Sequence, residues 1–361
     1  MKQHQLKSLI PVASTVIEAA HRHYTANGLA HVPVPQIVGI TGACENVDTL
    51  FKVKSRVPVP LFFCQTGQLT LEQALQFHPA VYTVMQSGRD EEAEDERHLR
   101  QFMLTEEEFD WSLVGGDAPY DEERMYEALL GHAEAAIKAF ALAVIGRHGE
   151  LLESAFGRDA AGLAASLTRP FHRISYEDAL ALLRLNGYPG LTWGSDLTSG
   201  HEAKVVEVLA DGGFPRPVFI MRYPKEIKFF NMKVSENDDR VVLSADLILP
   251  HAGEAVGSAV REHDAAKLEK RLLGSPMYRL HLENGGTLQD FRWYLDLVGS
   301  GNTRPHAGYG IGNERVIQYL LGSADIRDCS LFSLMARQTG DWIVEKRKEN
   351  AEKREMTAAV A

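Results

Sequence analysis

Apolar residues recur at helical spacing near the start of the chain, from Leu9 to Asn27. Because Asn27-Gly28 supplies a left-handed stop, this pattern predicts a long amphipathic helix that ends there. The next segment, His31 to Pro35, contains two prolines, and each fixes its own φ and disfavours helix in the residue before it. Since proline cannot donate to a central ladder, we expect an edge or interface strand here.

Two further helices and three strand-like runs follow. The stretch from Asp121 to Val144 has helical spacing, and Ser175 precedes another helical pattern as an N-cap. Runs at 217–222, 227–233 and 241–249 have the composition of strands. Because the strands follow one another instead of alternating with helices, the sequence predicts an α+β fold with an antiparallel sheet flanked by helices.

The composition is that of a globular protein, since 361 residues with 45% hydrophobic content can bury one large core or two modest ones. No run approaches the roughly 18 apolar residues that span a bilayer, so we expect a cytoplasmic protein with no membrane partner. Three scattered cysteines argue against a disulfide framework or a zinc cluster. The net charge of -11 works against a broad contact with a phosphate backbone.

The segment from residue 89 to residue 102 combines basic, acidic and aromatic residues, and it gives the first indication of function. Arg89 and Glu91 are followed, after a short polar loop, by Arg97-His98 and then Phe102. A bent triphosphate needs guanidinium groups for its oxygens and a flat apolar face for its base, and this segment supplies both. Taken alone, these residues are also compatible with a charged hairpin that carries surface ion pairs.

Two later segments have chemistry of the same kind. A glycine run from Gly308 to Gly312 is followed by Arg315, and no strand-and-acid context of a dinucleotide-binding loop surrounds it. Upstream, Asp246 precedes Glu254 by eight residues. Carboxylate oxygens are the hard ligands that magnesium requires when it bridges phosphates. By itself, this second segment is compatible with an edge strand that carries surface carboxylates.

Together these segments resemble the catalytic domain of class II aminoacyl-tRNA synthetases of the asparaginyl/aspartyl type. Residues 89–102 are similar to the second signature motif of that family, residues 308–315 to the third, and the first helix with Pro35 to the first. The matches occur in the family's order across roughly residues 10 to 335. The resemblance implies a six- or seven-stranded antiparallel sheet and a homodimer formed through the first motif.

The resemblance also implies a role in nucleotide binding for individual residues. The implied contacts are Arg89 with the α-phosphate and the reacting carboxylate, Glu91 with the adenine edge, Arg97 and His98 with the outer phosphates, and Phe102 and Arg315 with the faces of the base. Arg315 would also reach the γ-phosphate. Asp246 and Glu254 would bind Mg²⁺ beside the ATP.

For the amino acid, the resemblance implies that Glu45 and Gln68 hold the α-amino group and the carboxylate end. Arg261 would anchor the side chain. An aspartyl enzyme of this kind carries a lysine where Leu71 stands, so the sequence resembles the asparaginyl branch more closely. Glu106 agrees with that branch, because it stands where a carboxylate can accept from a side-chain amide.

The sequence departs from the family in three places. It begins at the catalytic domain, residues 92–96 read Glu-Ala-Glu-Asp-Glu, and residues 298–301 replace the family's Arg-Arg-Tyr-Gly. The acidic loop would repel a phosphate backbone. We therefore expect a single catalytic domain over residues 1–340 without an anticodon-binding domain, a charged helical tail over residues 341–361, and no tRNA partner.

The leading hypothesis from the sequence is a stand-alone ligase that resembles the archaeal asparagine synthetase related to asparaginyl-tRNA synthetase. Such an enzyme would adenylate aspartate with ATP and magnesium, and ammonia or another small nucleophile would then displace AMP. Three alternatives stay open: dehydration of asparagine to a nitrile, an asparaginyl-tRNA ligase, and a non-catalytic regulatory paralogue. The presence of Arg89, Glu254 and Arg315 argues against the last of these.

Overall fold

The computed structural model describes every residue except 1, 40–48, 57–58, 92–94, 211–214 and 334–361. Its strands are β1 (Ala30–His31), β2 (Ile37–Val38), β3 (Phe62–Phe63), β4 (Ala80–Gly88), β5 (Gln101–Asp110), β6 (His172–Ser175), β7 (Val218–Met221), β8 (Ser244–Leu249), β9 (Gly253–Val260) and β10 (His306–Gly312). Eight of them form one sheet in the order β1-β4-β5-β10-β9-β8-β7-β6, while β2 and β3 pair separately. Within the large sheet only the edge pairs β1–β4 and β6–β7 are parallel.

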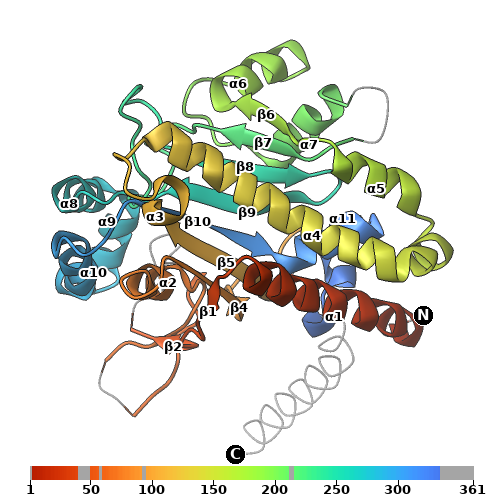
Figure 1. The fold of residues 1–361 in the computed structure, drawn as a ribbon, viewed down its shortest axis with the longest axis horizontal. Coiled ribbons are helices and arrows are strands. Elements are labelled where there is room, and N and C mark those ends of the chain that lie inside the picture. The colour runs from red at the N-terminus through yellow and green to blue at the C-terminus, as the bar shows by residue number, and fades with distance from the viewer. Residues whose placement is uncertain (1, 40–48, 57–58, 92–94, 211–214, 334–361) are drawn as a thin grey trace, which may run out of the picture.

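The helices surround this sheet (Figure 1). They are α1 (Lys2–Ala26), α2 (Gln68–Ala74), α3 (Trp111–Gly115), α4 (Glu122–Phe156), α5 (Ala160–Thr168), α6 (Tyr176–Leu185), α7 (Ser199–Val208), α8 (Ala265–Gly274), α9 (Pro276–Glu283), α10 (Gln289–Gly299), α11 (Asn313–Leu321) and the short 3₁₀-helix η2 (Ile326–Cys329). Helices α1 and α4 pack side by side against the sheet, while α8, α9 and α10 group together at one end (Figure 1).

The predicted helices are confirmed, and their ends have a local chemical cause. Helix α4 begins where the Asp121 side chain accepts from two backbone N–H groups, and it ends at Gly157, whose φ of 65° is left-handed. It therefore runs past the predicted end at Val144. Ser175 caps α6 by accepting from the backbone N–H of Asp178, as its position before the helical pattern predicts.

The strand predicted at residues 227–233 is wrong. Residues 227–233 are bends and turns with one isolated bridge, from Met232 to Arg261, and Lys228, Phe229 and Met232 line a cavity instead of extending the sheet. The six strands from β4 to β7 in the order of the sheet are antiparallel, in agreement with the six or seven expected, although the sheet has eight strands in the described part of the chain. The difference comes from the short parallel edges, since β1 has only two residues and β6 only four.

Helix α4 is also long and apolar enough to cross a membrane by length and composition. Its residues Tyr126, Leu130, Ile137 and Phe140 are fully buried in the main core together with residues of α1 and the sheet, while Leu142 is 38% exposed. Packing inside the fold therefore accounts for the apolar residues on the buried side of this helix.

The register of the central strands places one row of residues across the sheet. From β8 to β4 the row reads Asp246, Gly257, Gly310, Glu106 and Thr83, each residue opposite the next. The two glycines in the middle have no side chains, so only backbone lies between the carboxylates of Asp246 and Glu106. This backbone surface at Gly257 and Gly310 is called the glycine floor below. This floor separates the two ends of the site.

The neighbouring glycine of β10 allows a carboxylate to lie over the backbone. Gly308 is paired with Glu108, and a Cβ on Gly308 would lie 2.1 Å from the Glu108 carboxyl carbon and 2.4 Å from the Glu107 carbonyl oxygen. Such a close approach requires glycine at this position.

We therefore expect Gly308→Ala to destabilise the protein by about 1–3 kcal/mol, because the added methyl group overlaps backbone and a buried carboxyl group. Chemical denaturation monitored by circular dichroism measures the change. The matched control is Gly310→Ala on the same strand, since its Cβ would meet nothing closer than 3.5 Å. Equal stability of the two variants would contradict this account of the strand.

Candidate active site

A cavity of about 560 Å³ lies over the glycine floor. Each predicted site residue within the described chain lines it: Gln68, Arg89, Glu91, Arg97, His98, Phe102, Glu106, Asp246, Glu254, Arg261 and Arg315. Glu45 lies outside the described residues. Segments far apart in the sequence therefore converge on one cavity, as the nucleotide-binding hypothesis requires, while the role of each residue stays a prediction.

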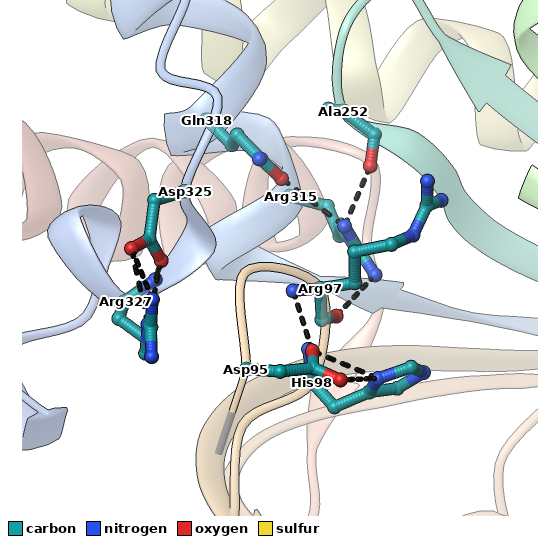
Figure 2. Close-up of polar contacts among 8 residues, drawn as sticks. All are labelled: Asp95, Arg97, His98, Ala252, Arg315, Gln318, Asp325 and Arg327. Atoms are coloured by element: carbon teal, nitrogen blue, oxygen red, sulfur yellow. Dashed lines mark hydrogen bonds and ion pairs between the residues drawn. The ribbon is translucent and has the colours of Figure 1, made fainter.

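At one end of this cavity, Arg315 of α11 forms hydrogen bonds to the turn that follows β8 and to the turn that precedes β5 (Figure 2). Its guanidinium group donates to the carbonyl oxygens of Ala252, at 2.7 Å, and Arg97, at 2.7 Å, and to the side chain of Gln318 at 3.1 Å. Burial and the charge of Arg97 lower the pKa of Arg315. The positive charges of Arg97 and Arg315 repel each other, and phosphate oxygens bound between them would neutralise both.

The turn that carries Arg97 and His98 is held by one exposed carboxylate. Asp95 accepts from the backbone N–H groups of Arg97 and His98, both at 2.7 Å, and from the His98 ring (Figure 2). The His98 ring and these N–H groups lower the pKa of Asp95 to about 2. The backbone N–H of Ile326 also donates to Glu96 at 3.0 Å, which ties the turn to η2.

The predicted magnesium ligands lie together at this end. The Glu254 side chain faces the cavity without a hydrogen bond or ion pair to another described residue, and its pKa is raised by burial and by the nearby charge of Asp246. A carboxylate in that state fits a divalent cation. Asp246 differs, since the Lys228 Nζ lies 2.5 Å from its Oδ2 atom. Burial disfavours the charged form of Lys228, but the nearby charges of Asp246 and Glu254 together favour it, so the pKa of this lysine is raised.

The opposite end of the cavity contains buried carboxylates. Glu106 accepts from the Thr66 hydroxyl and from the backbone N–H of Gly67, at 2.6 Å for the latter. Burial raises the pKa of Glu106 against these two hydrogen bonds. The N-terminus of α2 is thereby fixed beside β5, and this contact places Gln68 at the cavity wall.

Arg261, the predicted side-chain anchor, is paired with a residue that sequence reasoning missed. Its Nη2 and Nε atoms donate to Glu108 at 2.5 and 3.0 Å, and both side chains are nearly fully buried. Burial raises the pKa of Glu108 to about 7, although Arg261 opposes that shift. The alternation of strand residues was a usable signal, because Glu106 and Glu108 must share one face of β5.

A second missed carboxylate supports this end from behind. Glu72 accepts from Gln68 at 2.6 Å and from the Tyr294 hydroxyl at 2.7 Å, and it forms an ion pair with His306 at 3.2 Å. Burial disfavours the charged carboxylate, but His306, Arg261 and Gln68 together lower the pKa of Glu72, while Glu72 in turn raises the pKa of His306. The pair is therefore ionised, and it orients the amide of Gln68.

Comparison with known proteins connects this geometry to a family. Residues 1–336 match the family of class II tRNA synthetases (D, K and N). The chain is 34% identical over 329 residues to the asparagine–tRNA ligase of Pyrococcus furiosus, covering 90% of this chain and 68% of the relative. It is 32% identical over 340 residues to the enzyme of the same name from Roseiflexus castenholzii, covering 92% and 70%.

A solved structure agrees with the sequence relatives. The asparaginyl-tRNA synthetase of Pyrococcus horikoshii, crystallised with asparaginyl-adenylate, superposes with a TM-score of 0.78 at 32% identity, over 91% of this chain and 68% of that one. The sheet, its helices and the shared cavity thus define a catalytic domain of the class II synthetase type. The chain belongs to the class II tRNA synthetase family.

This membership confirms the predicted antiparallel fold and the predicted enzyme class, an ATP- and magnesium-dependent ligase that forms adenylates. The expectation that tRNA is not a partner receives no support from relatives that are named tRNA ligases. Three residues of the acidic loop on which it depends, 92–94, and the predicted tail over 341–361 lie outside the described residues.

One further buried carboxyl group lies in the cavity wall beside Arg315. Glu314 accepts from the backbone N–H of Met103 at 3.0 Å, and burial raises its pKa from 4.5 to about 7. A raised pKa means that folding favours the protonated form. The stability from this group is complete below pH 4.5 and is lost as the pH rises to about 7, because the unfolded chain releases the proton first.

We expect the free energy of unfolding of Glu314→Gln, relative to that of the unchanged protein, to rise by about 2–3 kcal/mol from pH 5 to pH 8. The reason is that glutamine keeps an acceptor and cannot ionise. Denaturation curves at both pH values measure the difference. Glu127→Gln is the control, because Glu127 is exposed on α4 and its variant should show no such trend. A pH-independent difference for Glu314→Gln would refute the buried-acid account.

Proposed function

We propose that this enzyme activates asparagine, or an amino acid with a similar side-chain amide, as its adenylate. The amino acid would bind at the end of the cavity opposite Arg315, here called the amino-acid end. The observation that carries the proposal is the charge balance there, since three buried carboxyl groups face two basic groups: Glu72, Glu106 and Glu108 against Arg261 and His306. A neutral amide can donate to a carboxylate and accept from a guanidinium group, whereas an aspartate carboxylate would add a further negative charge. The likeness to a synthetase solved with asparaginyl-adenylate supports this choice.

In this proposal the amino acid lies over the floor with its side chain toward Glu106 and Arg261. Arg89 holds the α-phosphate, and a carboxylate oxygen of the amino acid attacks the α-phosphorus as the bond to the bridging oxygen breaks and pyrophosphate leaves. Arg97 and Arg315 stabilise the charge that grows on the leaving group. Asp246 and Glu254 would hold magnesium, which would neutralise phosphate oxygens when bound.

Aspartate with ammonia as the nucleophile, the leading hypothesis from the sequence, is the second candidate. It is favoured by the pKa of Glu108, which is raised by burial to about 7. When Glu108 is protonated, that carboxylate no longer neutralises the charge of Arg261, so an aspartate side chain can pair with the guanidinium group. The two candidates therefore predict different responses to pH.

We expect the ratio of ATP–pyrophosphate exchange with asparagine over that with aspartate to rise severalfold from pH 6 to pH 8. Glu108 ionises in this range, since its pKa lies well above the ordinary value, and the new charge disfavours aspartate. The other groups that face Arg261 are Glu106 and Glu72, and His306 stays paired with Glu72.

Glu108→Gln removes this titration, so its exchange ratio should be flat with pH and shifted toward aspartate. Exchange rates with each amino acid at saturating ATP measure the effect. Faster exchange with aspartate than with asparagine at pH 8 in the unchanged enzyme would replace the first candidate with the second. Absence of exchange with either amino acid would reject both.

The acceptor is tested separately, because activation does not reveal where the acyl group goes. The full chain is incubated with ATP and magnesium and one of three substrate sets: asparagine with bulk tRNA, asparagine alone, or aspartate with ammonium. We expect one of these sets to give a product. Mass spectrometry distinguishes aminoacyl-tRNA, asparagine and a nitrile formed from asparagine alone. The predicted homodimer is tested by light scattering of the same preparation.

A further inference from the structure

Lys228 lies in the irregular segment between β7 and β8, and the predicted roles of the site leave it unused. Its Nζ atom is 2.5 Å from Asp246 Oδ2 and 4.0 Å from the centre of the Tyr223 ring. Only 16% of the side chain is exposed, and that part lines the cavity. A buried ammonium group therefore reaches the end of the cavity where Arg97 and Arg315 lie, here called the phosphate end, and it is available to a bound nucleotide.

A purely structural role does not account for this position. The segment is already fixed by backbone hydrogen bonds, from Lys225 to Arg240 at 2.9 Å and from Lys233 to Val260 at 2.9 Å, and by Arg271, which donates to the Met232 carbonyl oxygen. Lys228 could be apolar and the segment would keep these contacts. Burying two charged groups is also costly, so an ion pair at this depth needs another reason.

Charge provides that reason. Asp246 and Glu254 face the end of the cavity where Arg89, Arg97 and Arg315 would hold a polyphosphate. Without a cation beside it, the Asp246 carboxylate would repel the phosphate oxygens at short range in a poorly screened site. In the ion pair, the charge of Asp246 is already compensated by Lys228.

We propose that Lys228 is a built-in counter-cation of Asp246, which lets the enzyme bind ATP before a divalent cation arrives. This inference rests on the proposed use of ATP and adds to it an order of binding and a residue that controls it. Magnesium, once bound, neutralises the same carboxylate, so the contribution of Lys228 is greatest in its absence.

The test is calorimetric titration of ATP into the full chain without amino acid, in EDTA and in saturating magnesium. We expect Lys228→Met to weaken ATP binding about tenfold or more in EDTA and by less than about threefold in magnesium. Lys228→Arg should retain most of the affinity. Lys225→Met is the matched control, because this neighbouring lysine donates to the Asp239 carbonyl oxygen outside the cavity and should leave both affinities unchanged.

A double variant guards against a folding defect in Lys228→Met. Lys228→Met with Asp246→Asn contains neither charge of the pair, and in EDTA it should recover ATP affinity because the repelling carboxylate is gone. Equal losses with and without magnesium, or a double variant as weak as the single one, would overturn the counter-cation role. If the unchanged protein binds no ATP in either condition, the proposed function itself fails.

Discussion

The cavity depends on cross-strand register in an antiparallel sheet. Because Asp246, Gly257, Gly310 and Glu106 stand opposite one another on four strands, two acidic ends are held apart by a floor that has no side chains. Neither end could tolerate a shift of one residue, since the alternation of a strand would turn its carboxylates to the other face. The rest of the site is arranged around this spacing.

Opposite charges then determine what each end can bind. At the end proposed to hold phosphate, the Arg315 guanidinium group donates to the backbone carbonyl oxygens of Ala252 and Arg97. Among the described residues, no carboxylate lies at hydrogen-bonding distance from the guanidinium group of Arg97 or of Arg315. At the amino-acid end, Arg261 is bound by Glu108, and Glu72 is bound by His306. The first arrangement favours a polyanion and the second a neutral polar side chain, within one continuous cavity.

The opposite face of the sheet keeps this geometry rigid. Glu107, which lies between Glu106 and Glu108 on β5, points away from the cavity and contacts His132 of α4 at 2.7 Å, and it also accepts from the Tyr309 hydroxyl. Tyr24 of α1 contacts the same hydroxyl at 3.2 Å. The two long helices are therefore linked by polar contacts to the strands that carry the site, in addition to their apolar packing.

The sequence by itself determined the local elements and indicated most of the charged residues that line the cavity. Helical spacing, caps such as Asp121 and Ser175, and the collinear resemblance to class II synthetases indicated the fold and the residues that line the cavity, because these signals are carried by neighbours along the chain. Glu45 and the tail over 341–361 lie outside the described residues, so those expectations stay predictions. The strand expected at 227–233 was wrong, since a strand-like composition does not reveal that a segment lines a cavity.

Only the tertiary structure decided how the charges are paired. Arg261 with Glu108, Lys228 with Asp246, and Glu72 with His306 join residues at least 18 positions apart, and their partners depend on strand register and on the path of an irregular segment. Electrostatic energy depends on distance in space and on burial, which the order of residues along the chain does not specify. The residue types that could bind a nucleotide and an amino acid are therefore evident from the sequence, whereas the charge available at each end of the cavity is a property of the fold.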